Sequence, residues 1–190
     1  MRIRIYFEGT PALRPSLGEF LERAVPAARG KLKLVAGGGR DKTIDDFGRA
    51  FRNTCPDFLI LLVDSEEADD GKLEIRLRAK RNWRVPRNAR TKHRICWMVQ
   101  CMETWLIADR AALRGYYGRK LHEKSLPRNQ DVESIPKIDV LKALIRATKS
   151  QYDKGTHTAK ILLLLDPDVV CGAAPHCKRL REIIARQVGG

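Results

Sequence analysis

The chain has 190 residues, of which 43% are hydrophobic and 32% are charged. This length suggests one domain with a substantial core, and this composition excludes a disordered or collagen-like chain. The longest apolar runs, residues 58–63 and 161–165, are far shorter than the roughly 20 residues that cross a bilayer, so we expect no membrane association. The first residues alternate charged and apolar side chains without a signal-peptide pattern, which predicts a cytoplasmic protein.

The charge balance is strongly basic. Lysine and arginine number 37 against 23 acidic residues, for a net charge of +14. Such an excess predicts a polyanionic partner, nucleic acid first, although a solvated basic surface would have the same composition. The five cysteines form no Cys-x-x-Cys pair and the four histidines are scattered, so we expect reduced thiols and no zinc site.

Strand and helix patterns alternate in the first part of the chain. Residues 2–7 alternate charged with apolar side chains and predict a strand, which a helix follows. A second strand is predicted at 32–36, before a helix at 44–51 that has Thr43 as its candidate N-cap. Residues 58–63 are apolar throughout, as in a strand covered on both faces of a parallel sheet. This order predicts an α/β fold.

The second part of the chain begins with a basic segment at residues 72–94, in which ten basic side chains meet one acid. Pro86 interrupts this segment, so one continuous helix is not expected. A fourth strand is predicted at 95–99. Apolar side chains at helical spacing predict four later helices, at 102–113, 138–150, 157–165 and 175–188. We therefore expect one domain over residues 1–190, with a basic insertion at 72–94 and a helical C-terminal part at 137–190.

Acidic side chains follow two of the predicted strands. Glu8 comes after the first strand, and Asp64 and Glu66 follow the third. Ligands of open parallel sheets bind beyond the carboxyl ends of the strands, and residues two apart on an extended backbone point the same way. Converging carboxylates repel one another unless a cation holds them, and their oxygens select Mg²⁺ or Mn²⁺. The alternative is that Glu8 and Asp64 are loop-start residues or ion-pair partners of nearby arginines.

Three further sites are candidates for contacts with phosphate or with reacting groups. The glycines at 37–39 either form an anion-binding concavity or serve a tight turn, and Arg40 after them is the expected phosphate contact. Glu103 lies in an apolar stretch and must be paired or linked to a metal if it is buried. The alternative is an exposed Glu103 paired with Arg110, which lies close to the same helix face. Lys154 either meets a phosphate or is an exposed lysine.

Five segments occur in an order that resembles a bacterial family. They are Ile5-Tyr-Phe-Glu-Gly9, Gly38-Gly39-Arg40 with Asp46-Phe47, Leu61-Leu-Val-Asp-Ser-Glu66, Met98-Val-Gln-Cys-Met-Glu-Thr-Trp-Leu-Ile-Ala-Asp109 and Tyr152-x-Lys-Gly155. Together they resemble the domain-of-unknown-function 4276 family, which is itself similar to RloB-like proteins and to the Toprim domains of OLD-type nucleases. The resemblance covers most of the chain, and the segment around Glu103 is its most specific element.

The resemblance implies a Toprim-like fold, that is, a mostly parallel four-stranded sheet flanked by helices, here with extra C-terminal helices. It also implies a glutamate after the first strand and an Asp-x-Asp after the third, which serve metal-dependent phosphodiester chemistry. Glu8 and Asp64 match two of these positions, and Glu66 stands in place of the second aspartate. The further acid that OLD-type sequences often carry shortly after Glu-Gly has no counterpart here. An ATPase partner in a phage-defence system is also implied.

The leading hypothesis is an Mg²⁺- or Mn²⁺-dependent nuclease that acts on DNA or RNA. The expected metal ligands are Glu8, Asp64 and Glu66, with general base as an alternative role for Glu8. Glu103 would complete the catalytic site or orient a water. The side chains expected to contact phosphate or transition-state charge are Arg40, Lys154, Arg78, Arg81 and Arg84. The alternatives are an inactive Toprim-derived binding or sensor subunit of an ATPase complex, and a structural nucleic-acid-binding protein.

Overall fold

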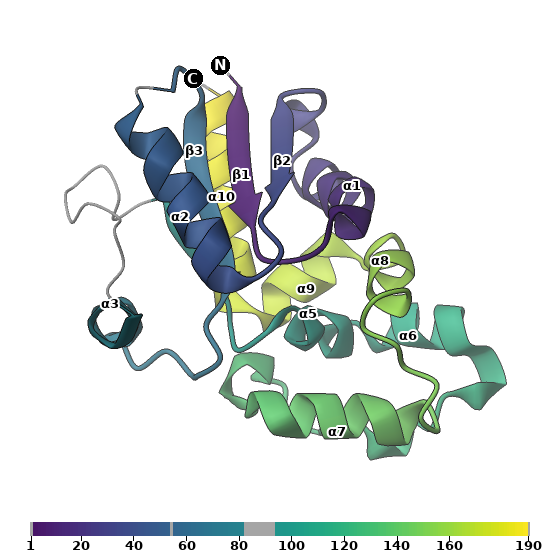
Figure 1. Ribbon diagram of the computed structural model, residues 1–190. Helices are drawn as coiled ribbons and strands as arrows, with labels where there is room; N and C mark the ends of the chain where they lie inside the picture. The colour runs from purple at the N-terminus through teal and green to yellow at the C-terminus, as the bar shows by residue number, and fades with distance from the viewer. Residues whose placement is uncertain (1, 54, 82–93, 190) are drawn as a thin grey trace.

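The centre of the fold is a sheet of four parallel strands in the order β2-β1-β3-β4 (Figure 1). The computed structural model describes residues 2–53, 55–81 and 94–189. The strands are β1 (Ile3–Phe7), β2 (Leu32–Ala36), β3 (Phe58–Asp64) and β4 (Ile95–Met98). The predicted α/β class, the four strand positions and the parallel sheet are therefore confirmed.

Strand β3 is buried on both faces because it is apolar on both faces. Ile60 and Leu62 belong to one hydrophobic core, and Leu59, Leu61 and Val63 belong to the other. Strands of this kind lie inside parallel sheets that carry helices on both sides. The side chains of β3 thus hold the middle of the sheet, and the acid at its end is positioned by a rigid element.

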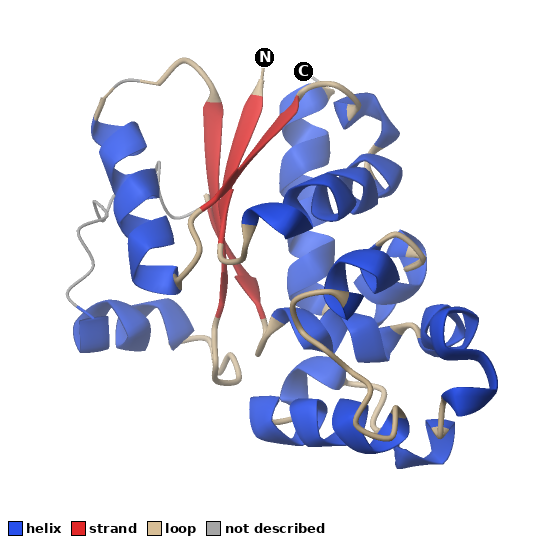
Figure 2. Ribbon diagram, turned by 45° about the vertical axis from the view of Figure 1, so that its right-hand side comes forward, coloured by secondary structure: helices blue, strands red, loops and turns tan. Residues whose placement is uncertain are grey.

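Helices cover the sheet on both faces (Figure 2). α2 (Arg40–Arg52) and α3 (Leu73–Arg81) lie on one face, and α1 (Arg14–Ala24) and α10 (Pro175–Val188) lie on the other. Their apolar sides complete the two cores between which the sheet is packed. This layering is the arrangement that alternating strands and helices produce.

The rest of the C-terminal half is a group of helices along one side of the sheet and beyond its carboxyl edge (Figure 1). They are α5 (Met102–Ala108), α6 (Arg110–Tyr117), α7 (Lys137–Ala147), α8 (His157–Leu162) and α9 (Pro167–Ala173). Short 3-10 helices are η1 (Pro11–Leu13), η2 (Pro26–Ala28), η3 (Gly118–Lys120), η4 (Glu123–Ser125) and η5 (Val132–Ser134). Within the described residues, every helix is too short or too polar to span a membrane.

The prediction of one helix over 102–113 was wrong, because two helices meet at Asp109. This residue has φ −106° and ψ 90°, outside the helical region. Its carboxylate accepts hydrogen bonds from the N–H groups of Ala112 at 3.0 Å and Asp166 at 2.8 Å. The apolar spacing continues across the break, whereas the capping aspartate ends one helix and begins the next.

Other helix boundaries also differ from the predictions, and the helix predicted over 138–150 ends early, at Ala147. α2 begins at Arg40, four residues early, with Gly39 as its N-cap; the hydroxyl of Thr43 donates to the Gly39 carbonyl oxygen at 2.8 Å from inside the first turn. The helix predicted over 157–165 ends early, as α8 at Leu162, and α9, which begins after the N-cap Asp166, was not predicted. Proline at the first position of α9 favours this second start.

The start of β1 and the end of α10 lie side by side at the amino edge of the sheet (Figures 1 and 2). The carboxyl ends of the strands point the other way, toward α5 and α7. The two edges of the sheet therefore have different neighbours, and the acids that follow the strands lie on the side away from the chain ends.

Candidate functional site

Glu8 and Asp64 meet at the carboxyl edge of the sheet. Strands β1 and β3 are parallel neighbours, so the residues at their carboxyl ends lie side by side. The Glu8 N–H donates to the carbonyl oxygen of Leu62 at 2.9 Å, and the Glu8 carboxylate accepts the N–H of Asp64 at 3.2 Å. Two acids far apart in the sequence are thus held together by backbone geometry.

Arg40 lies between Glu8 and Glu66. Its Nε donates to Glu8 Oε2 at 3.2 Å, and its Nη2 is 2.7 Å from Glu66 Oε1. Burial disfavours the charged guanidinium, but the two carboxylates outweigh this effect and raise the pKa of Arg40. Its third nitrogen, Nη1, is buried and has no hydrogen-bond partner among the described residues. The expected phosphate contact is therefore bound to two acids in the structure.

The glycine turn uses its N–H groups within the backbone. Gly9 and Gly38 exchange two hydrogen bonds, at 2.9 and 3.0 Å, and the Gly37 N–H donates to the carbonyl oxygen of Phe7 at 3.1 Å. A Cβ atom at Gly37 would lie 2.1 Å from Thr43 Oγ1, so only glycine fits this approach. The turn is a close backbone approach, and the N–H groups of Gly37 and Gly38 are not available to an anion.

The carboxyl group of Asp64 is buried at the end of β3. One of its oxygens accepts the N–H of Met102 at 3.0 Å, and the other is 3.9 Å from the ammonium of Lys137. Burial and the charges of Glu8 and Glu103 raise the pKa of Asp64 to about 7, although two lysines oppose the shift. A carboxylate in this environment is stabilised by any cation that approaches it.

Glu103 is fully buried in the first turn of α5. Its Oε1 is 3.1 Å from Lys154 Nζ and accepts a hydrogen bond from the Tyr152 hydroxyl at 3.1 Å. Burial disfavours the charged ammonium, but Glu103 outweighs it and raises the pKa of Lys154. The alternative pairing with Arg110 was wrong, because Arg110 instead donates to the carbonyl oxygen of Pro127.

Lys137 is a member of the site that the sequence analysis missed. It stands at the first position of α7, and its Nζ is 3.2 Å from Glu66 Oε1. No motif around Lys137 signals a functional role, so only the fold reveals it. Burial alone would raise the pKa of Glu66, but Arg40 and Lys137 outweigh it and lower that pKa.

The backbone of Glu66 is in the left-handed region, with φ 62°. This conformation costs a non-glycine residue of the order of 1–3 kcal/mol, and such residues cluster at functional sites. The turn that contains Glu66 is held by a hydrogen bond from the Ser65 hydroxyl to the Glu67 carbonyl oxygen at 2.6 Å. The Glu66 carboxylate that follows this strained turn contacts Arg40 and Lys137.

Together these residues form one group of four carboxylates and three cations, which we call the acid–base cluster. Its members are Glu8, Asp64, Glu66, Glu103, Arg40, Lys137 and Lys154. Among the described residues, no group of three or more acid, histidine or cysteine side chains is arranged to hold a metal ion. The oxygens best placed to offer hard ligands are those of the adjacent Glu8 and Asp64.

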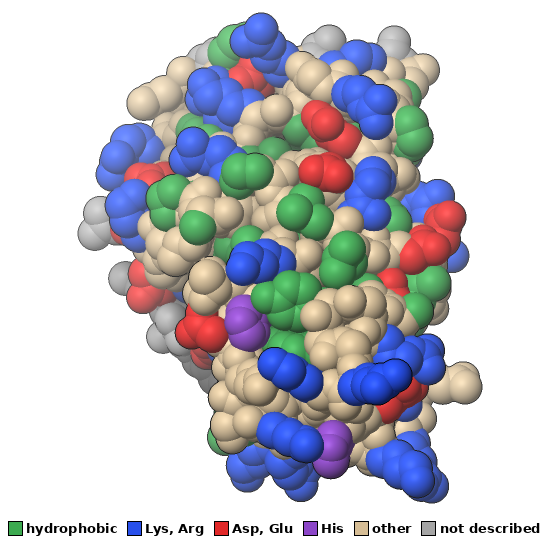
Figure 3. All heavy atoms as spheres, turned by 90° about the vertical axis from the view of Figure 1, so that its right-hand side faces the viewer, with side chains coloured by type: hydrophobic (Ala, Val, Ile, Leu, Met, Phe, Trp, Pro, Cys, Tyr) green, Lys and Arg blue, Asp and Glu red, His purple; other side chains and the backbone are tan. Residues whose placement is uncertain are grey.

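The basic segment is described only in part. Arg78 lies in α3, where its side chain is buried and its Nε donates to Glu74 at 2.8 Å, so it is not an open phosphate contact. Arg81 is the last residue of α3, and Arg84 lies outside the described residues. Basic side chains are also spread over the face in Figure 3, interspersed with acidic ones.

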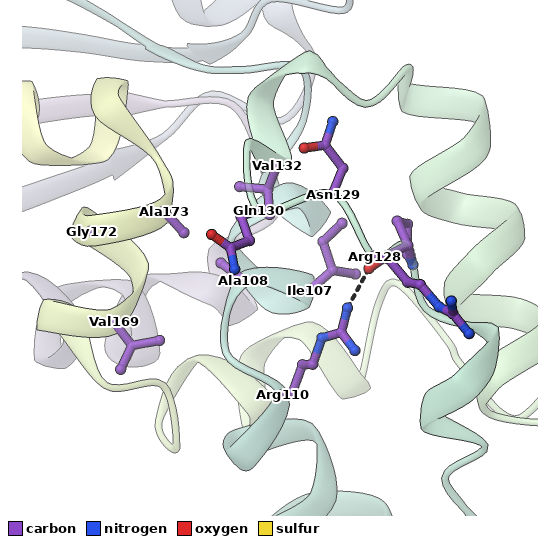
Figure 4. Close-up of a pocket in the computed structure, with 11 residues that line it drawn as sticks. Ile107, Ala108, Arg110, Arg128, Asn129, Gln130, Val132, Val169, Gly172 and Ala173 are labelled. Carbon is purple, nitrogen blue, oxygen red and sulfur yellow. Dashed lines mark hydrogen bonds between the residues drawn. The ribbon is translucent and has the colours of Figure 1, made fainter.

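A cavity of about 550 Å³ lies near the end of α5 and is separate from the acid–base cluster (Figure 4). Its wall includes Ile107 from α5, Arg110 from α6, Val132 from η5, and Val169 and Ala173 from α9. None of the predicted site residues lines it. The cavity therefore adds no member to the cluster.

The fold and the cluster define an all-parallel α/β domain with acids and bases gathered at the carboxyl edge of its sheet. The chain belongs to the family described as Domain of unknown function (DUF4276), whose model matches residues 11–185. The match includes every member of the cluster except Glu8. Neither the curated proteins nor the solved structures contain a match to the chain.

Proposed function

We propose that this protein is an Mg²⁺- or Mn²⁺-dependent nuclease that hydrolyses phosphodiester bonds of DNA or RNA. The observation that carries the proposal is the convergence of Glu8, Asp64 and Glu103 with basic side chains at the carboxyl edge of a parallel sheet. Ligands of open α/β sheets bind at this edge. Metal-dependent phosphodiester cleavage needs hard oxygen ligands beside cationic groups, and both are present here.

Glu8 and Asp64 would hold the divalent cation. Mg²⁺ is commonly bound through one or two protein carboxylates, with water and phosphate oxygens as its other ligands, so a pair suffices. Bound there, the cation would activate a water nucleophile and neutralise charge that develops on the phosphate. The burial and like charges that raise the pKa of Asp64 to about 7 favour cation binding at this pair.

The remaining members of the acid–base cluster would bind and orient the substrate. Lys154 is half-exposed, so its ammonium can contact a phosphate while the buried carboxylate of Glu103 holds it in place. Arg40 has a buried Nη1 without a partner among the described residues, and a phosphate oxygen would supply the acceptor it lacks after a small local movement. Glu66 binds Arg40 and Lys137, and we assign it the role of orienting these cations.

The resemblance to Toprim domains supports the same proposal. The Toprim glutamate and first aspartate correspond to Glu8 and Asp64, which lie together at the sheet edge. The position of the second Toprim aspartate is occupied by Glu66, which makes ion pairs with cations. An ATPase partner, a role in phage defence and a cytoplasmic location remain predictions.

One observation favours a second candidate, a nucleic-acid-binding or sensor subunit without catalysis. In the described part of the chain, the carboxylates of the acid–base cluster make ion pairs with Arg40, Lys137 and Lys154, and three ligands do not gather around one point. An internally neutralised cluster would be stable without any metal. Such a module would bind nucleic acid and leave it intact.

Asp64→Asn separates the two candidates. Asparagine keeps the acceptor for the Met102 N–H and removes the charge, so the variant should fold as stably as the native protein. We expect native protein to cleave labelled DNA or RNA only with Mg²⁺ or Mn²⁺, Asp64→Asn to lose cleavage at least 100-fold, and nucleic-acid affinity to stay level or rise. Asp45→Asn, at an exposed position on α2, is the matched control and should cleave normally.

Two results would count against the nuclease. If Asp64→Asn cleaves as well as the native protein, the metal site is not at this pair. If the native protein binds nucleic acid and shows no cleavage with either metal, the non-catalytic subunit is the correct reading. Thermal melting of both variants confirms that any loss is not a loss of folding.

A further inference from the structure

Two thiols face each other at the corner between α9 and α10. The Sγ atoms of Cys171 and Cys177 are 3.5 Å apart, and both side chains are buried. Cys171 belongs to the last turn of α9, and Cys177 belongs to the first turn of α10. Each thiol is therefore held by a helix end, and neither cysteine belongs to the acid–base cluster.

The backbone fixes this corner on both sides. The Ala174 N–H donates to the carbonyl oxygen of Val170 at 2.8 Å, and the Lys178 N–H donates to the Ala174 carbonyl oxygen at 3.1 Å. Ala174 is fully buried, and Pro175 begins α10 immediately after it. Because the two helix ends share this buried residue, the thiols stay close together while the fold is intact.

The surroundings of the pair favour a thiolate on Cys171. A hydrogen bond from Cys177 lowers the pKa of the Cys171 thiol, and the guanidinium of Arg181 lowers it further against the effect of burial. Arg181 is held in place by Asp168, with 2.5 Å between Nη1 and Oδ1. The thiolate is the nucleophilic form of cysteine, and redox-active cysteines typically have a low pKa and a second cysteine beside them.

The other cysteines lack this environment. Burial raises the pKa of Cys96 and of Cys101 to about 12, which keeps them as inert thiols. Cys55 is half-buried and lies on the other face of the sheet. The cavity wall includes Gly172 and Ala173, the two residues that follow Cys171 in α9 (Figure 4).

We propose that Cys171 and Cys177 are a redox-active dithiol that closes to an intrachain disulfide when the protein meets a peroxide. The thiolate of Cys171 attacks a peroxide oxygen, the O–O bond breaks, and a sulfenic acid and hydroxide form. The thiol of Cys177 then attacks the sulfenic sulfur, an S–S bond forms, and water leaves. The two sulfurs lose two electrons in total, and one hydrogen peroxide is reduced to two waters. A dithiol such as dithiothreitol reverses the reaction by exchange.

The experiment measures the mass and thiol count of the intact protein before and after a modest excess of hydrogen peroxide. We expect the mass to fall by about 2 Da, the loss of two hydrogen atoms, and the free thiols in denaturant to fall from the five of the reduced chain to three. Both cysteines lie in one tryptic peptide, residues 161–178, which should carry the whole mass change. Peptide 95–110, which contains Cys96 and Cys101, should be unchanged and is the internal control.

Variants decide the assignment. Cys171→Ser and Cys177→Ser should each abolish the 2 Da loss, whereas Cys55→Ser should keep it. Dithiothreitol should restore all thiols of the native protein. The proposal is overturned if peroxide oxidises Cys55 while the peptide 161–178 keeps both thiols, or if that peptide gains only oxygen atoms. Because the oxidised peptide is identified directly, a serine variant that folds poorly does not prevent the test.

Discussion

At the scale of single residues, the buried Glu103 carboxylate depends on Lys154 and Tyr152. Lysine neutralises the charge of a side chain that is fully buried, so its removal leaves an uncompensated carboxylate. We expect Lys154→Met to lower the free energy of unfolding by about 1–2 kcal/mol, less than the 3–5 kcal/mol typical of fully buried pairs, because Lys154 is half-exposed. Urea denaturation followed by circular dichroism measures this difference.

Making the same Lys154→Met change in a Glu103→Gln variant isolates the effect of the Glu103 charge. In Glu103→Gln the side chain is neutral and still accepts the Tyr152 hydroxyl, so adding Lys154→Met to it should cost little. Lys142→Met, at an exposed position on α7, is the matched control for losing a lysine. Equal losses in both backgrounds would show that Lys154 contributes packing and not compensation of the Glu103 charge.

The residues of the site differ in how far the sequence predicts them. Glu8 and Asp64 were predictable because an acid after a buried parallel strand must lie at the carboxyl edge. The ion pair of Glu8 with Arg40 agrees with the alternative that an acid here is the partner of a nearby arginine, but the sequence does not say which arginine, because a pattern shows where a side chain starts and not what it binds. Lys137 gives no local signal, since it reaches Glu66 only through the packing of α7 beyond the sheet.

At the scale of elements, His176 ties three segments together. Its Nδ1 is 2.6 Å from Glu133 in η5, and its Nε2 is 3.0 Å from Asp69 in the loop before α3. Burial disfavours the imidazolium, but the two carboxylates outweigh it and raise the pKa of His176. His176, the second residue of α10, thus links this helix to η5 and to the loop that leads into α3.

This link makes stability depend on pH in a defined direction. A raised pKa means that the contribution of His176 is fully present below the unfolded value near 6.5 and is lost as pH rises through the higher folded value. We expect the difference in unfolding free energy between the native protein and His176→Gln to be largest near about pH 5.5 and to shrink toward about pH 8.5. Chemical denaturation at several pH values measures it.

The control for this prediction is His122→Gln. His122 is exposed, and no ion pair joins it to an acid among the described residues. This variant should follow the native pH profile. The ion pairs assigned to His176 would be contradicted if the difference in unfolding free energy between the native protein and His176→Gln grew with pH.

The strands and helices show why the residues at which an element begins and ends were harder to predict than its presence. All four strands were predictable because their apolar side chains, alternating in the first strand and consecutive in the third, form short patterns bounded by turn residues. The break at Asp109 was not, because the apolar stripe runs through both α5 and α6 and the deciding contact is with the distant Asp166. Likewise, the early start of α2 follows from the glycine turn, in which Gly38, just before the N-cap Gly39, exchanges hydrogen bonds with Gly9, a tertiary feature.

At the scale of the whole molecule, the net charge of +14 predicts nucleic-acid binding without saying which surface carries it. Because Arg78 is buried against Glu74, the test uses the other arginines of the basic segment. We expect the triple change of Arg81, Arg84 and Arg87 to glutamine to weaken binding and to flatten the plot of log K against log salt. Each lost phosphate contact lowers the slope by about 0.9.

The control is a second triple variant that removes three positive charges from a different part of the surface. Arg29, Lys31 and Lys33 are exposed at the amino edge of the sheet, beside the start of β2, so their change to glutamine should leave the slope nearly unchanged. Fluorescence anisotropy at several salt concentrations measures both triples. Equal slopes for the two variants would mean that the basic segment is a solvated face and not the binding surface.

The start of β1 and the end of α10 lie side by side at the amino edge of the sheet, on the far side from the acid–base cluster. A linker attached before β1 or after α10 therefore projects away from the carboxyl edge. Either end can carry an affinity tag or a fused fluorescent protein without covering Glu8 or Asp64. The same geometry allows the molecule to be anchored on a sensor chip by either end, with its cluster turned toward the flowing solution.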